Sequence, residues 1–149
     1  MFGISIITHG NMSEGIADAL EVIFGSSDAV TPITLYKDDD ISELGNKIES
    51  FISDNKDKDG IFLFTDLQDA SPYNQSLFAV NKAEELDKEK VFVISGVNLP
   101  LILEVVNHNL IGSSLEDTVA ALKQQAQTSI NFQQVLMNDD NEDDFDDGF

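Results

Sequence analysis

Apolar and polar positions along the chain follow two different periods. Some segments are short, nearly continuous apolar runs rich in β-branched residues, such as 3–8, which is typical of strands buried on both faces of a sheet. Other segments repeat apolar residues every three or four positions, as a helix with one buried face does. The pattern predicts strands over 3–8, 33–36, 61–65 and 91–95, and helices over 13–24, 41–52, 72 to about 86, 99–106, and 113 or 114 to about 128.

Strands and helices therefore alternate, which predicts an α/β fold: an open, doubly wound, mainly parallel sheet with helices on both faces. An imperfect alternation from Ile130 to Met137 adds a candidate last strand at the sheet edge. We expect one domain over 1–137, because the length is that of a single domain. Seven acids among the nine residues from 139 to 147 predict a disordered acidic tail over 138–149.

Charge narrows the choice of partners. The chain has 28 acidic and 8 basic residues, for a net charge of −20, and every basic residue is Lys. Nucleic acids and anionic membrane surfaces require clustered positive charge, so we expect neither as a partner. A partner with a basic face fits the acidic balance better. Without Arg, an anion site has to use backbone N–H groups, helix N-termini, hydroxyls, His or Lys.

The chain contains no Cys, which removes disulfides, zinc–thiolate sites and cysteine nucleophiles from consideration and is typical of a reducing compartment. Its apolar start is short and is interrupted at Thr8, which does not fit a signal peptide. No apolar run approaches the roughly 20 residues that cross a bilayer. We therefore expect a cytoplasmic protein.

Polar residues follow the first and third predicted strands at the point where each ends. His9 comes directly after 3–8, and Asp66 directly after 61–65. Sites in a doubly wound sheet lie beyond the carboxyl ends of the strands, where the strand order reverses. If these two strands are neighbours across that point, His9 and Asp66 face one crevice, with Ser71 near the start of the following helix.

This combination suits a phosphoryl group carried on a histidine. Imidazole is a good nucleophile near neutral pH. A carboxylate bonded to one ring nitrogen fixes the tautomer and stabilises the positive charge that grows as the other nitrogen attacks. Helix N-termini and a hydroxyl such as that of Ser71 can receive the phosphoryl oxygens, and Gly10 leaves space beside the ring. The chemistry needs no metal and no cofactor.

Three other interpretations remain open on the residues alone. His9 and Asp66 can form only a hydrogen-bonded loop. They can bind a metal together with His108, although the three residues have no recognisable ligand spacing and His108 suits a helix C-terminus or the surface. Asp66 and Asp69 can be the carboxylate pair of a glycoside hydrolase, which no other feature supports.

Three motifs narrow the choice. They are IITHG at 6–10 followed by SEG at 13–15, FTDL at 64–67 followed by SPYN at 71–74, and ISGVNLP at 94–100. In this order and at these distances the chain, over roughly 3–137, resembles the EIIA component of the mannose/fructose/sorbose family. That family belongs to the bacterial phosphoenolpyruvate-dependent sugar phosphotransferase system.

The resemblance implies the doubly wound fold and a role for individual residues. His9 would take a phosphoryl group on Nε2 from a phosphohistidine of HPr and hand it to a histidine or cysteine of EIIB, with membrane permease components involved only indirectly. Asp66 would hold Nδ1, and Ser71 would lie beside the phosphate. The resemblance also implies a homodimer that exchanges its last strand, here 130–137, as an antiparallel edge strand.

One position departs from the family pattern. Relatives usually carry Gly-Gly before Ser-Pro, where this chain has Asp69 and Ala70, and Asp69 adds negative charge near the phosphate. Two further functions also stay open. One is the phosphocarrier subunit of a dihydroxyacetone kinase, although such proteins more often have His-Ser where this chain has His9 and Gly10. The other is a regulatory or small-molecule-binding domain without onward transfer.

Overall fold

The computed structural model describes residues 1–136, so the acidic tail predicted over 138–149 lies outside the described residues. The elements are β1 (Phe2–His9), α1 (Met12–Phe24), β2 (Thr31–Leu35), α2 (Ile41–Asn55), β3 (Gly60–Thr65), α3 (Ser71–Lys82), the short 3-10 helix η1 (Lys88–Lys90), β4 (Val91–Ile94), α4 (Leu99–Ile111) and α5 (Leu115–Thr128). Each strand and helix expected from the pattern up to residue 128 is present.

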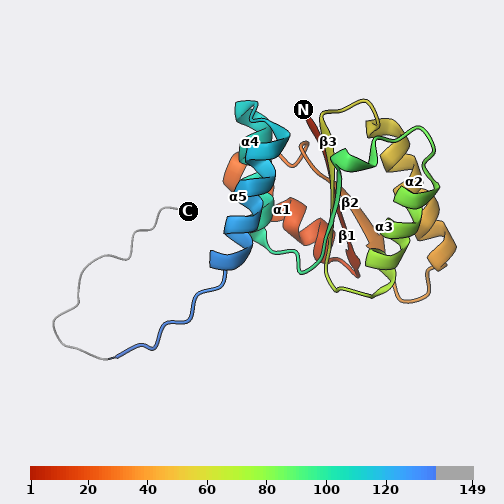
Figure 1. Cartoon of the computed structure of the whole chain (residues 1–149). Helices are drawn as coiled ribbons and strands as arrows, with labels where there is room; N and C mark the ends of the chain where they lie inside the picture. The colour runs from red at the N-terminus through yellow and green to blue at the C-terminus, as the bar shows by residue number, and fades with distance from the viewer. Residues whose placement is uncertain (137–149) are drawn as a thin grey trace.

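The four strands form one sheet in the order β2-β1-β3-β4, and every neighbouring pair is parallel. Helices α2 and α3 cover one face of the sheet, and α1, α4 and α5 cover the other (Figure 1). This confirms the predicted α/β fold. The chain leaves β1 for β2 on one side and later reaches β3 on the other side, so the strand order reverses between β1 and β3.

Two apolar clusters form the core, one on each face of the sheet. Phe62 and Phe64 of β3 pack with residues of α1, α4 and α5, whereas Ile61 and Leu63 pack with residues of α2 and α3. Successive side chains of a strand point to opposite faces, so a strand covered on both sides needs apolar residues at nearly every position. Among the described residues, no helix is both long and apolar enough to cross a membrane.

Two helix ends differ from the prediction. Helix α3 ends at Lys82 and not near residue 86, because Ala83 has an extended backbone with φ −71° and ψ 104°. Helix α4 continues to Ile111, beyond the predicted 106, and ends where Gly112 takes the left-handed conformation with φ 71°. Glycine adopts that conformation without steric cost and commonly ends helices in this way.

The candidate last strand is not part of the sheet of a single chain. Residues 130–136 have no strand assignment and are exposed, and Met137 lies outside the described residues. In Figure 1 the chain after α5 runs away from the sheet. The expected edge strand therefore does not pair within its own chain, and its exchange into a second chain stays a prediction.

Candidate functional site

His9 is the last residue of β1 and its first exposed residue, because the seven residues before it are buried. The N–H of the following Gly10 donates to the carbonyl of Leu35 at the end of β2, at 2.8 Å. This bond continues the parallel pairing one step past His9. The His9 side chain is 46% exposed. The strand thus delivers an imidazole to the carboxyl edge of the sheet, in reach of solvent.

Asp66 meets His9 because β1 and β3 are neighbours, with Ile7 opposite Thr65. Its Oδ2 lies 2.7 Å from His9 Nδ1 and also accepts the backbone N–H of His9 at 2.9 Å. Its Oδ1 accepts the N–H of Leu67 at 2.9 Å. The Asp66 side chain is only 11% exposed. The two residues predicted to share a crevice are therefore in direct contact, at the point where the strand order reverses.

Asp66 decides which nitrogen of His9 carries a proton. Burial alone would raise the pKa of Asp66, but the backbone N–H of His9, its ring and the N–H of Leu67 together hold that pKa below its ordinary value. An ionised carboxylate only accepts hydrogen bonds, so Nδ1 of His9 is the protonated nitrogen. The lone pair then lies on Nε2, and no group of residues 1–136 forms a hydrogen bond with that atom.

Gly10 directly follows His9 and begins the turn into α1. Apart from its neighbours in the chain, no atom lies within 4 Å of the position that a Cβ of Gly10 would occupy. Its φ of 56° is left-handed, where other residues are strained. Its N–H already donates to Leu35. Gly10 therefore shapes the turn after His9, and its predicted place beside a phosphate stays a prediction.

The start of α1 is held by β1. The side chain of Asn11 makes no cap bond, and the N–H of Ser13 donates instead to Oγ1 of Thr8 at 2.8 Å. Asn11, the residue at the N-cap position, therefore does not cap the helix with its side chain. The cap comes from the buried residue before His9, and a sequence search for caps next to the helix does not find it.

Ser71 is the first residue of α3, which starts at the same edge of the sheet. Three other helices, α2, α4 and α5, begin with a residue whose side chain accepts a backbone N–H of the first turn. These capping residues are Asp40, Asn98 and Ser114, respectively. Helix α3 has Ala70 at that position and no side-chain cap. No hydrogen bond joins Ser71 to His9 or Asp66. Its predicted phosphate contact stays a prediction, with an uncapped helix start as its setting.

The backbone conformation at Asp69 and Ala70 shows what the two positions of the Gly-Gly pattern require. Asp69 has a φ of 63° and is the one non-glycine residue of the described chain with a positive φ, whereas Ala70 is extended with φ −87°. The first position of the pair therefore needs a left-handed backbone, which glycine takes freely and Asp takes at some cost.

Residues of the third motif, 94–100, form backbone hydrogen bonds with the end of β3 and the residue after it. The N–H groups of Gly96 and Val97 donate to the carbonyls of Asp66 and Thr65, at 3.1 and 3.0 Å. Asn98 accepts the N–H of Leu101 at 3.0 Å and so caps α4. Sequence reasoning gave Asn98 no role, although an Asn one residue before Leu-Pro is a helix-start signal that identifies it.

The second histidine lies elsewhere. His108 is in the last turn of α4, with Nδ1 2.8 Å from Ser113 Oγ and Nε2 3.2 Å from Glu104 Oε1. It does not join His9 and Asp66. Within residues 1–136, no group of three or more His, Cys, Asp or Glu is placed to hold a metal ion.

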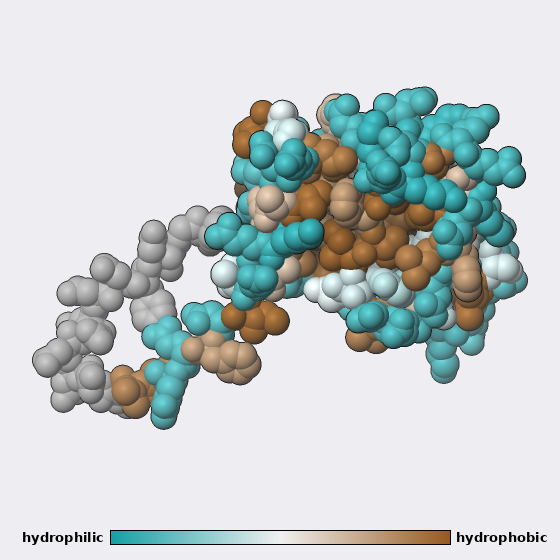
Figure 2. Space-filling model, viewed as in Figure 1, coloured by the Kyte–Doolittle hydropathy of each residue, from teal (hydrophilic) through white to brown (hydrophobic). Residues whose placement is uncertain are grey.

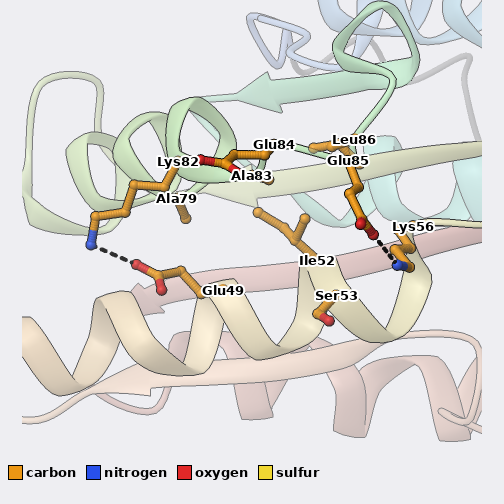
Figure 3. Close-up of a pocket in the computed structure, with 10 residues that line it drawn as sticks. All are labelled: Glu49, Ile52, Ser53, Lys56, Ala79, Lys82, Ala83, Glu84, Glu85 and Leu86. Atoms are coloured by element: carbon orange, nitrogen blue, oxygen red, sulfur yellow. Dashed lines mark hydrogen bonds and ion pairs between the residues drawn. The ribbon is translucent and has the colours of Figure 1, made fainter.

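A hollow of about 380 Å³ lies between α2 and α3 (Figure 3). Two ion pairs lie along it, Lys82 with Glu49 at 3.0 Å and Lys56 with Glu85 at 2.8 Å. Neither His9 nor Asp66 lines it. The His–Asp pair thus stands outside this hollow, on the exposed edge of the sheet.

Comparison with known proteins shows which family the chain is similar to. A family described as PTS system fructose IIA component matches residues 3–123. The sorbose-specific EIIA component of the PTS system of Lacticaseibacillus casei is 30% identical over 144 residues, which cover 95% of this chain and 99% of that protein. The fructose-specific EIIA component of Bacillus subtilis (strain 168) is 23% identical over 128 residues, covering 85% of this chain and 84% of that protein. A crystal structure of phosphotransferase system component EIIA from Streptococcus agalactiae superposes with a TM-score of 0.77 at 26% identity, over 89% of this chain and 97% of that one.

Proposed function

The chain belongs to the family of PTS system fructose IIA components, and on that premise we propose that it is a phosphocarrier in which His9 accepts a phosphoryl group from phospho-HPr and passes it to an EIIB component. The observation that carries the proposal is the 2.7 Å contact of His9 Nδ1 with Asp66. It leaves the lone pair on Nε2, at the exposed edge of the sheet. The two transfers serve the coupled uptake and phosphorylation of a sugar.

In the first transfer, Nε2 of His9 attacks the phosphorus atom in line with the bond to the donor histidine. The new P–N bond forms as the donor's P–N bond breaks, and the electron pair of that bond returns to the donor imidazole. The proton of His9 stays on Nδ1 against Asp66. The positive charge of the phosphorylated ring therefore lies beside a carboxylate, which stabilises it. The second transfer runs the same chemistry outward, with EIIB as acceptor.

The phosphoryl oxygens need donors that the neighbouring elements can supply. Ser71 offers a hydroxyl at the start of α3, where no side chain caps the backbone N–H groups. A helix start favours an anion through these N–H groups and through the helix dipole. Gly10 contributes the turn that brings α1 close to His9.

The exposure of His9 favours macromolecular partners over a small substrate. Small-molecule sites usually enclose most of the ligand surface, whereas His9 is nearly half exposed and stands at an edge. A docked protein can reach Nε2 there and exclude water from the phosphohistidine during transfer. The net charge of −20 suits a partner with a basic face.

We also propose a homodimer in which residues 130–136 of one chain cover the edge of the other. Among residues 1–136, strand β4 pairs only with β3, so its second edge is unpaired in the part of the chain that the structure describes. Figure 2 shows apolar side chains gathered on this face, between α5 and α3. An apolar hollow of about 120 Å³ lies there, lined by Phe62, Phe92, Ile94, Leu101, Val119, Leu122, Lys123 and Ala126. The segment 130–136 carries matching exposed apolar residues, among them Phe132 at 94% exposure.

Intact-protein mass at neutral pH tests the phosphocarrier. The protein is incubated with phosphoenolpyruvate, enzyme I and HPr, beside His9→Ala and the matched control His108→Ala. We expect one acid-labile phosphoryl group on the wild type and on the control, and none on His9→Ala. Equal labelling of His9→Ala would refute the assignment of His9.

Onward transfer separates the remaining functions. A sugar-family EIIB should remove the label from the wild type, which a purely regulatory phosphoacceptor would retain. If a dihydroxyacetone kinase drains the label and EIIB does not, the chain is the phosphocarrier subunit of that kinase. An absence of any label from HPr would instead favour a small-molecule-binding domain.

A further inference from the structure

The loop from Asp66 to Ser71 connects the carboxylate that contacts His9 to the first residue of α3. Its first residue is firmly bonded, because the carbonyl of Asp66 accepts the N–H of Gly96 at 3.1 Å and its side chain accepts the N–H of Leu67 at 2.9 Å. The second half is bonded more weakly. Within the loop, the N–H of Ala70 reaches the carbonyl of Leu67 only at 3.4 Å.

The weak half of the loop contains its strained residue. Asp69 has a φ of 63°, a conformation that L-residues other than glycine avoid unless their surroundings hold them there. Asp69 is exposed, so packing does not hold it. The side-chain amide of Asn74 does: its Nδ2 donates to the carbonyl of Asp69 at 3.0 Å. The backbone N–H of Asn74 donates to the carbonyl of Ala70 at 2.9 Å.

We propose that Asn74 is a positioning residue for phosphoryl transfer at His9, acting through its bond to the left-handed Asp69, an inference that rests on the proposed function. The bond from Asn74 holds the second half of the loop, as the bond from Gly96 to the carbonyl of Asp66 holds its first residue. It thereby fixes the start of α3, where Ser71 and its uncapped neighbours receive the phosphoryl oxygens. Without it, Asp69 relaxes toward negative φ and the two residues after it move with the backbone.

Such a change acts on the rate of transfer more than on docking. Asn74 is only partly buried and lies in the first turn of α3, three residues after Ser71. Small misplacement of a group that contacts the transferring phosphoryl lowers the rate steeply. The surface that meets HPr is left in place. The mark of a positioning role is therefore a lower kcat at an unchanged KM for phospho-HPr.

The test uses four variants of the full chain: Asn74→Ala, Asp69→Gly, the double variant, and Asn81→Ala. Asn81 is an exposed residue of the same helix, which makes it the matched control. Initial rates of His9 phosphorylation are measured against phospho-HPr concentration, and thermal midpoints are recorded for each variant. Because glycine takes a positive φ unaided, Asp69→Gly should remove the need for the amide.

We expect Asn74→Ala to lower kcat about tenfold with KM within about twofold of wild type, and Asn81→Ala to match the wild type. In the Asp69→Gly background the same change should cost less than about threefold. A wild-type kcat for Asn74→Ala, or an equal loss in both backgrounds, would overturn the inference while His9 labelling keeps the proposed function intact. A wild type that is not labelled at His9 would remove both.

Discussion

The chain has two histidines, each beside an acidic side chain, and the two regions differ in what they leave free. His9 bonds Asp66 through Nδ1 at 2.7 Å, and its side chain is 46% exposed. His108 uses both ring nitrogens, Nδ1 toward Ser113 and Nε2 toward Glu104, and is 18% exposed. The first arrangement leaves Nε2 of His9 without a hydrogen bond among residues 1–136, and the second gives both ring nitrogens of His108 a partner at the end of a helix.

The difference comes from the elements that carry the two residues. His9 ends a buried parallel strand next to another, so its acid partner arrives from a neighbouring strand on one side of the ring. His108 lies in the last turn of a helix, where Glu104 is four residues before it and Ser113 follows the helix end. A histidine–acid contact alone therefore does not mark a reactive site. The nitrogen left open is what distinguishes His9 from His108 and supports the role proposed for His9.

Exchange of each acid for its amide sharpens this comparison most. In Asp66→Asn, the neutral amide can still accept the backbone N–H of His9, but it no longer stabilises the positive charge that grows on the ring as Nε2 is phosphorylated. We expect phosphorylation by HPr to slow about a hundredfold. Glu104→Gln is the matched change beside His108 and should leave the rate unchanged. Initial rates from intact mass measure both, and a similar rate for the two variants would break the distinction.

Removal of the second histidine should affect stability and not labelling. His108→Ala loses the hydrogen bonds to Ser113 and Glu104 at the end of α4. We expect the free energy of unfolding to fall by about 1 kcal/mol, as for the loss of a partly buried hydrogen bond. Urea denaturation at pH 7 measures this change. Slower phosphorylation in the fully folded variant would contradict the separation of the two regions.

We expect low pH to remove the contribution of Asp66 to the free energy of unfolding. Its pKa is held below the ordinary value in the folded chain, so its ionised form stabilises the fold above about pH 4. That contribution is lost as the pH falls through the lowered pKa, because the carboxylate is then protonated in both states. The difference in unfolding free energy between the wild type and Asp66→Asn should therefore shrink from pH 7 to pH 3. A difference that persists at pH 3 would show that ionisation of Asp66 is not its source.

The smallest effect is expected from Glu104→Gln on stability. The pair with His108 is partly exposed and spaced four residues apart on one helix, and such pairs contribute little. The amide can still accept a hydrogen bond from the ring. We expect a change within about 0.5 kcal/mol by urea denaturation. A fall of more than about 2 kcal/mol in the free energy of unfolding would show that Glu104 contributes to stability as a buried acidic partner does, and not as a partly exposed one.

Much of the fold was predictable because burial dictates the sequence pattern. The runs at 3–8 and 61–65 are apolar at nearly every position since both faces of the sheet are covered, and a strand end followed by His9 or Asp66 locates the site edge. Their contact followed once β1 and β3 proved to be neighbours.

Other features could not be predicted from local pattern. The cap of α1 comes from Thr8 in a strand, and the left-handed Asp69 depends on the side chain of Asn74. Residues 130–136 alternate like a strand but pair with none in their own chain. The exchange proposed for this segment would leave no local mark beyond the alternation itself, so the sequence pattern alone does not show which strand it pairs with.

NMR of the phosphorylated protein can show whether Nε2 of His9 is the atom that carries the phosphoryl group. The protein is labelled with 15N in its histidines, phosphorylated by HPr and observed by NMR at neutral to alkaline pH, where ring nitrogen shifts report which atom carries phosphorus. We expect one phosphohistidine, His9 substituted at Nε2, and an unmodified His108. Phosphorus on Nδ1 of His9, or on His108, would contradict this expectation.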